Sequence, residues 1–221
     1  MIRRAVFFDL DGTLTDPKPG ITQCIAHALA GLGRTPPDLD ALHWCIGPPL
    51  RGSFARLLDT TDETTLDRAM ALYRERFGDV GLFENALYPG VPEAVAAVRA
   101  AGFATFVATS KPHVYATRIV AHFDLAPLFD GVYGSELDGT RVEKGDLIAH
   151  ALADQHLDPK RVVMIGDREH DLIGAKRCGV RAIGVTYGYG TPEELRAHGA
   201  EALAHAPHAI PDLVATVLRR T

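Results

Sequence analysis

The sequence has no excess of basic residues and no long apolar run. Its formal net charge is −5 and its isoelectric point is near 6.0. Such a balance gives no basic surface of the kind that binds nucleic acid polymers or anionic membranes. No apolar run approaches the roughly 20 residues that a membrane-spanning helix needs. We therefore expect neither a nucleic acid polymer nor a membrane as a partner.

Cysteine is also scarce, and its placement excludes a disulfide framework. The three cysteines, Cys24, Cys45 and Cys178, lie far apart and form no Cys-x-x-Cys pair. They are typical of reduced thiols in a cytosolic protein. The residues before the first expected strand contain no secretory signal, and the ten histidines show no zinc spacing. These absences predict a cytoplasmic protein without structural zinc.

Strands and helices alternate through most of the chain, which predicts an α/β fold with a doubly wound parallel sheet. Residues 17–85 interrupt this alternation with helical patterns and no good strand. We therefore expect an α/β core domain from residues 1–16 and 86–221, with an inserted all-helical cap domain from residues 17–85. The expected strands of the core cover residues 5–8, 103–108, 131–134, 161–165 and 182–186. Its expected helices cover residues 91–101, 112–122, 145–155, 169–178 and 210–218.

The first expected strand, Ala5–Phe8, runs directly into two acidic residues. Asp9 follows the strand, Asp11 comes two residues later, and Gly12 then favours a turn. Two carboxylates at this spacing can point the same way, and they repel each other unless a cation, a shared proton or hydrogen-bond donors compensate. A solvated turn after the strand is the alternative interpretation of this segment alone.

Polar residues follow two further strands, at Thr109–Ser110 and at Asp167. In an open parallel sheet, ligands bind outside the carboxyl ends of the strands, so these residues are expected to converge with Asp9. Lys144 precedes the helix expected from residue 145. A cation is unfavourable at a helix N-terminus, and an anion nearby would account for it. Simple helix capping and a solvated lysine are the alternatives.

Four segments in this order resemble the motifs of the haloacid dehalogenase superfamily, in its phosphatase branch. They are Asp9-Leu-Asp-Gly-Thr-Leu-Thr-Asp16, Val107-Ala-Thr-Ser-Lys111, Lys144 and Gly166-Asp-Arg-Glu-His-Asp171. The helical insertion resembles the small cap of the phosphoglycolate phosphatase-like branch. This resemblance implies a HAD-like Rossmannoid core with a helical cap.

The resemblance also implies catalytic roles. Asp9 would be the nucleophile that forms an aspartyl-phosphate, and Asp11 the general acid and base. The presence of Asp11 argues against the dehalogenases of the superfamily. Thr109 and Lys144 would complete the catalytic set. Mg²⁺ would be the cofactor, and its expected ligands are Asp9, the backbone carbonyl of Asp11, and Asp167, with Asp171 holding a metal-bound water or orienting its neighbours.

Substrate contacts are expected from Ser110 and Lys111 in the core and from Arg51 and Lys18 in the cap. The expected reaction is hydrolysis of a small phosphomonoester, most simply a phosphoglycolate-type substrate. A 5'-nucleotidase acting on nucleoside monophosphates is one alternative. A β-phosphoglucomutase-like phosphomutase is another, although related mutases usually show Glu-Asp where this chain has Gly166-Asp167. A non-enzymatic binding module would have no use for Asp11. The protein is expected to be a monomer or a homodimer.

Overall fold

The structure is a computed structural model that describes residues 3–219. It contains two compact units, one formed by residues 1–16 and 87–221 and the other by residues 17–86. We call the first the core unit and the second the cap unit. No helix in the described part of the chain has the length and apolarity needed to cross a bilayer.

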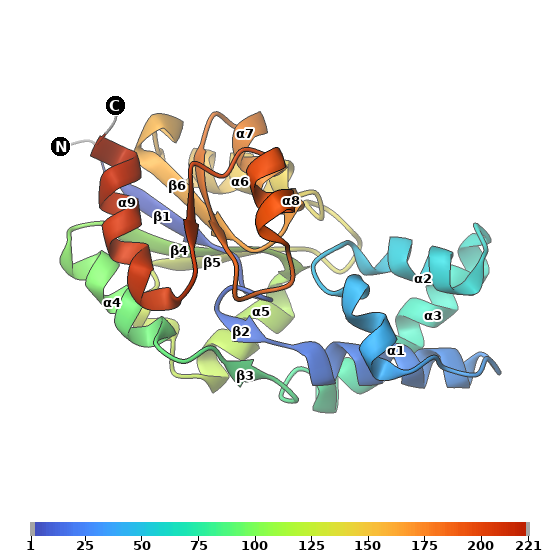
Figure 1. The fold of residues 1–221 in the computed structure, drawn as a ribbon. Coiled ribbons are helices and arrows are strands. Elements are labelled where there is room, and N and C mark those ends of the chain that lie inside the picture. The colour runs from blue at the N-terminus through green and yellow to red at the C-terminus, as the bar shows by residue number, and fades with distance from the viewer. Residues whose placement is uncertain (1–2, 220–221) are drawn as a thin grey trace. The chain divides into compact units, whose positions relative to one another are not determined.

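The core unit is built on a six-stranded sheet in the order β5-β4-β1-β6-β7-β8 (Figure 1). All five strand pairs are parallel. The chain adds β4 and β5 on one side of β1 and then crosses to add β6, β7 and β8 on the other side. The strands are β1 (Ala5–Phe8), β4 (Ala104–Pro112), β5 (Gly131–Ser135), β6 (Val162–Gly166), β7 (Arg181–Val185) and β8 (Ala202–Ala204).

Helices cover both faces of this sheet. One pair, α6 and α7, packs together against β4, β6 and β7, while α4 and α9 pack together elsewhere on the sheet (Figure 1). The helices of the core unit are α4 (Val91–Ala100), α5 (His113–His122), α6 (Lys144–Asp154), α7 (Glu169–Arg177), α8 (Pro192–Ala197) and α9 (Ile210–Arg219). Short 3₁₀ turns lie at Ala126–Leu128, Pro159–Arg161 and Pro207–Ala209.

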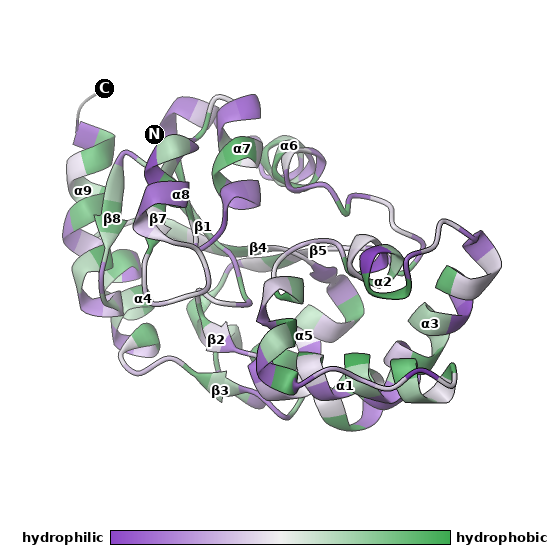
Figure 2. Cartoon of the chain, turned by 45° about the vertical axis from the view of Figure 1, so that its right-hand side comes forward, coloured by the Kyte–Doolittle hydropathy of each residue, from purple (hydrophilic) through white to green (hydrophobic). Residues whose placement is uncertain are grey.

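The strands are buried on both faces, as their apolar sequences require. In β1, Ala5 and Phe7 belong to the apolar cluster that also contains the buried face of α6, whereas Phe8 meets Phe129 edge-on with ring centroids 5.9 Å apart. Successive side chains of a strand point to opposite faces, so an unbroken apolar run fits a sheet that is covered on both sides. The helices are instead two-sided, and α9 mixes green apolar residues with purple polar ones (Figure 2).

The cap unit is helical. Its elements are α1 (Lys18–Gly31), a 3₁₀ helix η1 (Leu39–Cys45), α2 (Leu50–Leu58), α3 (Glu63–Arg76) and a π-helical turn η2 (Phe77–Gly81). Aromatic rings fill its interior, and Tyr73 stacks on Phe77 and meets Phe54 edge-on. The backbones of α1 and η2 are in close contact. A Cβ on Gly20 would lie 2.0 Å from the Gly81 carbonyl oxygen, so no side chain fits between them. Two short strands, β2 (Thr15–Asp16) and β3 (Ala86–Leu87), pair where the chain leaves and re-enters the core unit.

The expected fold class, a parallel α/β sheet with an inserted helical segment, is confirmed. Several boundaries differ from the expectation. The strand expected to end at residue 108 continues to Pro112, and the helix expected from residue 145 begins at Lys144. The segment at residues 202–204, where no strand was expected, is the edge strand β8. Strands of two or three residues are too short to show a period in the sequence, which explains why β2, β3 and β8 were missed.

The packing of β4 on β1 predicts a large stability loss for Phe106→Ala. The Phe106 ring is fully buried and lies 5.7 Å from the Phe7 ring in an edge-on arrangement. Removal of a buried phenyl ring typically costs about 3–5 kcal/mol through lost burial and the cavity that remains. Denaturant unfolding should show this loss, while Val114→Ala, at a side chain that is 47% exposed, should change stability by less than about 0.5 kcal/mol. Equal losses for the two variants would contradict the assigned core.

Candidate active site

Three neighbouring strands of the core sheet lead to polar residues at the same edge. Asp9 follows β1, Thr109 lies in β4, and Asp167 follows β6. Because β1 pairs with both β4 and β6, these positions are adjacent. The backbone N–H of Asp9 donates to the Ile165 carbonyl at 2.8 Å, which continues the ladder one residue past β1. The sheet therefore gathers the expected residues where its strand order reverses, the usual ligand position in such folds.

Lys144 is the cation at the centre of this group. Its side chain is 4% exposed, and its Nζ lies 2.8 Å from Asp9 Oδ1 and 2.7 Å from Asp171 Oδ1. It also donates to the Ala108 carbonyl at 3.0 Å. Burial alone would lower the pKa of the Lys144 ammonium, but the charges of Asp171 and Asp9 raise it above its usual value. A Cβ on Gly174 of α7 would lie 2.9 Å from Lys144 Cβ, so the missing side chain lets the start of α6 pack closely on α7.

Asp11 forms an ion pair with a different lysine from the one that pairs with Asp9. Lys111 Nζ lies 2.8 Å from Asp11 Oδ2, and the Lys111 side chain is only 6% exposed. Burial raises the pKa of Asp11, although Lys111 opposes that shift. The two carboxylates expected to divide the chemistry therefore have different counterions, Lys144 for Asp9 and Lys111 for Asp11.

Asp167 lies against the turn that carries Asp11. The backbone N–H of Tyr189 donates to Asp167 Oδ2 at 2.8 Å, while Asp167 Oδ1 is buried and has no hydrogen-bond partner among residues 3–219. Gly12 has a positive φ of 81°, and a Cβ there would lie 2.1 Å from Asp167 Oδ2, so the turn requires glycine on both counts. Burial, with the charges of Asp171 and Asp9, raises the pKa of Asp167 well above its ordinary value.

Three of the aspartates form a group that can hold a metal ion. One carboxylate oxygen from each of Asp9, Asp167 and Asp171 lies within 4.8 Å of the others. Burial raises the pKa of Asp171 as well, despite the nearby Lys144. The backbone N–H of Arg168 donates to Asp171 Oδ2 at 3.2 Å, which orients this side chain at the start of α7.

The polar residues near the end of β4 do not cap a helix, which was the alternative interpretation for them. Thr109 and Ser110 are part of β4, and the Thr109 hydroxyl accepts a hydrogen bond from the backbone N–H of Lys111 at 3.2 Å. The Ser110 carbonyl accepts from the Ser135 hydroxyl of β5 at 2.7 Å. α5 begins only at His113, so these hydroxyl groups belong to the strand end and not to a helix cap.

The two expected cap residues have carboxylate partners within the cap unit. Arg51 pairs with Glu63 and, at 2.7 Å, with Asp67. Lys18 Nζ lies 2.8 Å from Asp40 Oδ1. A role for Arg51 and Lys18 toward substrate stays a prediction, and a substrate anion would have to compete with these carboxylates.

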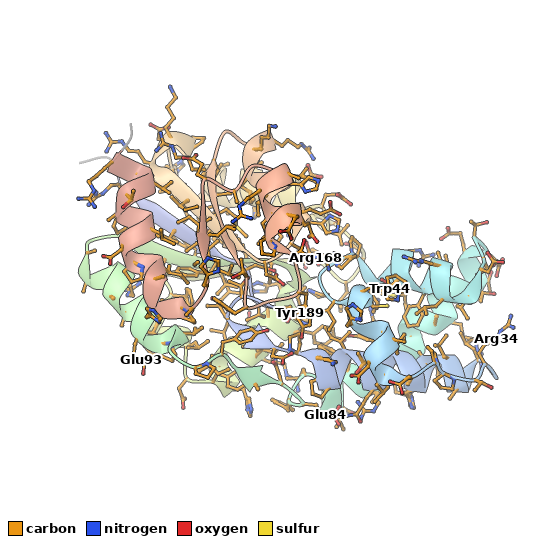
Figure 3. All side chains as sticks on the ribbon, in the orientation of Figure 1. Arg34, Trp44, Glu84, Glu93, Arg168 and Tyr189 are labelled. Carbon is orange, nitrogen blue, oxygen red and sulfur yellow. The ribbon has the colours of Figure 1, made fainter. Side chains whose placement is uncertain are left out.

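The sequence analysis assigned no role to residues 187–190. The structure adds the hydrogen bond from Tyr189 to Asp167 (Tyr189 is labelled in Figure 3). The donor is a backbone N–H, which every residue except proline carries, so residue type gave no signal for it. The pairing of Lys111 with Asp11 was also missed, because Lys111 was assigned to substrate.

Comparison with curated proteins gives relatives over most of the chain. A protein of Pseudomonas aeruginosa named "5'-nucleotidase" is 50% identical over 193 residues, which cover 87% of each chain. "Tyrosine-protein kinase PtkA" of Mycobacterium tuberculosis is 36% identical, with 91% of this chain and 68% of the relative covered. A "Phosphoglycolate phosphatase" of Caulobacter vibrioides is 31% identical, with 96% and 91% covered.

Comparison with solved structures agrees with this grouping. The crystal structure of a predicted phosphatase from Clostridium acetobutylicum is 39% identical and has a TM-score of 0.91, with 99% of this chain and 100% of that chain covered. Residues 6–185 match the family described as "Haloacid dehalogenase-like hydrolase". The resemblance seen in the four motifs is thus confirmed, and the chain belongs to the haloacid dehalogenase-like hydrolase family.

Proposed function

We propose that this hydrolase is a Mg²⁺-dependent phosphatase that cleaves a small phosphomonoester through an aspartyl-phosphate on Asp9. The observation that carries the proposal is the pair of buried carboxylates with separate lysines. Asp9 is paired with Lys144 at 2.8 Å, and Asp11 is paired with Lys111 at 2.8 Å. Two carboxylates with different surroundings can act as nucleophile and as acid in one site.

In the first half-reaction, a carboxylate oxygen of Asp9 forms a bond to phosphorus as the bond from phosphorus to the leaving oxygen breaks. Asp11 gives its proton to that oxygen. In the second half-reaction, Asp11 takes a proton from water, the water oxygen bonds to phosphorus, and the bond to Asp9 breaks. The raised pKa of buried Asp11 favours the protonated form that the first half-reaction needs. Thr109, Ser110 and Lys144 are the proposed phosphate contacts.

The site residues fit a divalent cation. The cluster combines four buried aspartates with two buried lysine side chains, namely Asp9, Asp11, Asp167, Asp171, Lys111 and Lys144. The carboxylates outnumber the ammonium groups by two, and Asp167 Oδ1 has no partner in the described residues. An all-oxygen donor set suits Mg²⁺ better than zinc. Asp9, the Asp11 carbonyl and Asp167 would hold it, with Asp171 behind them. Bound Mg²⁺ would supply charge stabilisation for the transferring phosphoryl group.

The substrate is proposed as a phosphoglycolate-type ester or a nucleoside monophosphate. The helical cap, which resembles that of the phosphoglycolate phosphatase-like branch, favours the first, and the relative that is 50% identical and named 5'-nucleotidase supports the second. A phosphomutase of the β-phosphoglucomutase type fits less well. Its usual glutamate before the metal-site aspartate would replace Gly166, where even a Cβ would lie 2.2 Å from the Asp171 carboxylate.

The central test is turnover by wild type and Asp9→Asn on a panel with p-nitrophenyl phosphate, phosphoglycolate and nucleoside monophosphates. We expect Asp9→Asn to lower kcat by roughly 10³-fold or more, because the nucleophile is lost. EDTA should stop the wild type and Mg²⁺ should restore it. Asp146→Asn, at an exposed aspartate of α6, is the matched control and should keep full activity. Wild-type kcat in folded Asp9→Asn protein would refute the covalent mechanism.

Asp11→Asn separates the acid from the nucleophile. The variant keeps the backbone carbonyl, so Mg²⁺ binding should persist, while the acid–base contribution of about 10²–10⁴-fold in rate should be lost. In single-turnover phosphorylation, alkyl esters should lose more than aryl esters, because a good leaving group needs less protonation. Equal losses for the two ester classes would count against the acid role.

Asp167→Asn tests the cation site through stability. Because its pKa is raised on folding, Asp167 binds its proton more tightly in the native protein than in the unfolded chain. The stability from this proton is present below the ordinary carboxyl value of about 3.9 and is lost as pH rises through the native pKa. The metal-free wild type should therefore lose stability toward neutral pH, whereas a neutral asparagine avoids that loss.

In EDTA at pH 7.5, denaturant unfolding should show Asp167→Asn more stable than wild type by about 1–2 kcal/mol, as expected when an uncompensated buried charge is removed. The gain should shrink as the pH falls toward 4. Added Mg²⁺ should stabilise the wild type much more than the variant. If Mg²⁺ stabilises both proteins equally, Asp167 is not a ligand.

A further inference from the structure

A loop after β7, residues 186–190, lies directly against Asp167. In addition to the hydrogen bond from the Tyr189 N–H, the loop approaches through two glycines. A Cβ on Gly188 would lie 2.3 Å from the Gly12 carbonyl oxygen and 2.5 Å from Asp167 Cβ. A Cβ on Gly190 would lie 2.0 Å from the Asp167 carbonyl oxygen. No side chain fits between this loop and the aspartate, so a displacement of the loop also displaces the partner of Asp167 Oδ2.

The same loop is hydrogen-bonded to the segment that follows Asp11. The Tyr189 hydroxyl donates to Asp16 Oδ1, and the Tyr187 hydroxyl donates to the Thr13 carbonyl at 3.1 Å. The ring of Tyr88 meets that of Tyr187 edge-on, with centroids 5.1 Å apart. All of these residues belong to the core unit. Within this loop, Tyr189 therefore bonds to two aspartates, with its backbone to Asp167 and with its phenol to Asp16.

This arrangement gives the two oxygens of Asp167 different surroundings. Oδ2 accepts from the Tyr189 N–H, and Oδ1 is buried without a partner in the described residues. A carboxylate ligand that is held by one oxygen presents the other in a fixed direction, and such supporting hydrogen bonds tune metal affinity. A phenol keeps its proton at neutral pH, so the Tyr189 hydroxyl is a donor to Asp16 there.

We propose that Tyr189 is a positioning residue for the cation site, in which its phenol anchors the loop on Asp16 so that its backbone N–H holds Asp167. The proposal rests on the proposed Mg²⁺ site and adds a residue that does not itself touch the cation or the substrate. Because Tyr189 acts through the loop, its loss should change the affinity for the cation and not the rate of the chemical step.

Tyr189→Phe removes only the hydroxyl and keeps both the ring and the backbone N–H. We expect this variant to bind Mn²⁺, used as a spectroscopic substitute for Mg²⁺, roughly 10-fold more weakly in the absence of substrate, the low end for lost supporting contacts. Electron paramagnetic resonance titration of free Mn²⁺ measures this without turnover. In activity assays, the Mg²⁺ concentration for half-maximal rate should rise by a similar factor, while kcat at saturating Mg²⁺ should stay close to wild type.

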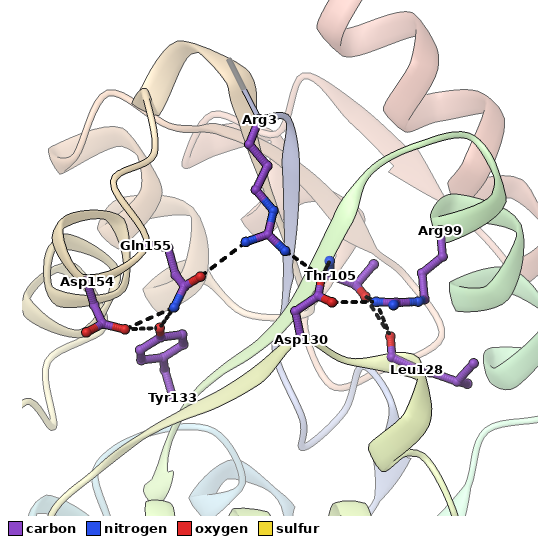
Figure 4. A network of polar contacts seen from close by, with 8 residues as sticks. All are labelled: Arg3, Arg99, Thr105, Leu128, Asp130, Tyr133, Asp154 and Gln155. Atoms are coloured by element: carbon purple, nitrogen blue, oxygen red, sulfur yellow. Dashed lines mark hydrogen bonds and ion pairs between the residues drawn. The ribbon is translucent and has the colours of Figure 1, made fainter. Parts of the chain in front are cut away.

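Tyr133→Phe is the matched control. Tyr133 in β5 also donates its hydroxyl to an aspartate, Asp154, at 2.5 Å, and accepts from Gln155 in a polar network away from the site (Figure 4). Loss of this hydroxyl should lower the melting temperature by an amount comparable to Tyr189→Phe and leave Mn²⁺ affinity unchanged. A merely structural role for Tyr189 would give the same result for both variants, namely lower stability with wild-type affinity, and would overturn the proposal.

Asp16→Ala removes the acceptor of the same hydrogen bond and decides the question if Tyr189→Phe does not fold. It should also weaken Mn²⁺ binding, and the loss in the double variant with Tyr189→Phe should be smaller than the sum of the two single losses, because both changes remove the same hydrogen bond. Additive effects of the two changes would overturn the proposed linkage. Asp167→Asn serves as the reference for the site itself. If it binds Mn²⁺ as well as the wild type, the proposed metal site fails, whereas a failure confined to Tyr189→Phe refutes only the positioning role.

Discussion

The structure depends most on one buried cation, the ammonium group of Lys144. It lies between Asp9 and Asp171 and also donates to the Ala108 carbonyl, with 4% of its side chain exposed. Breaking a buried ion pair typically costs about 3–5 kcal/mol, because the remaining charge has no partner. Lys144 is 135 positions from Asp9 in the chain, so this contact requires that β1, β4 and the start of α6 all be in place. The fold and the site are therefore specified by the same interaction.

Close backbone approach is the second requirement, and it explains why several positions around the site lack side chains. Gly174 makes room for Lys144, and Gly166 makes room for the Asp171 carboxylate. At each position the backbone lies directly against a charged side chain. An added methyl group would therefore push a carboxylate or an ammonium away from its partner. The charges can be gathered this closely because the strand ends and helix starts meet through glycine.

The sequence was sufficient for the parts of the structure that rest on local pattern. The apolar run before Asp9 and the alternation of strands and helices predicted the sheet, and Thr109 and Asp167 were expected to converge with Asp9. In the structure, β4, which carries Thr109, and β6, which Asp167 follows, both pair with β1. What failed depends on tertiary contacts. Strand β8 has three residues and pairs on the edge of β7, and Lys111 lies in the part of β4 beyond the expected strand end, where it pairs with Asp11. The hydrogen bond from Tyr189 to Asp167 uses the backbone, so no residue-type rule could find it.

The distribution of charge gives the two catalytic candidates distinct properties although they are only two positions apart. Asp9 shares Lys144 with Asp171, whereas Asp11 has Lys111 and a pKa raised by burial. Asp167 and Asp171 also have raised pKa values, so the cluster as a whole opposes full ionisation when no cation is bound. Residues that destabilise a protein in this way persist at functional sites because the surrounding core compensates for them. Here β1 and β4 contribute the phenylalanines Phe7, Phe8 and Phe106, all fully buried. Buried apolar strands thus lead directly into the charged cluster, and the stability of the sheet is what allows that charge to remain in place for chemistry.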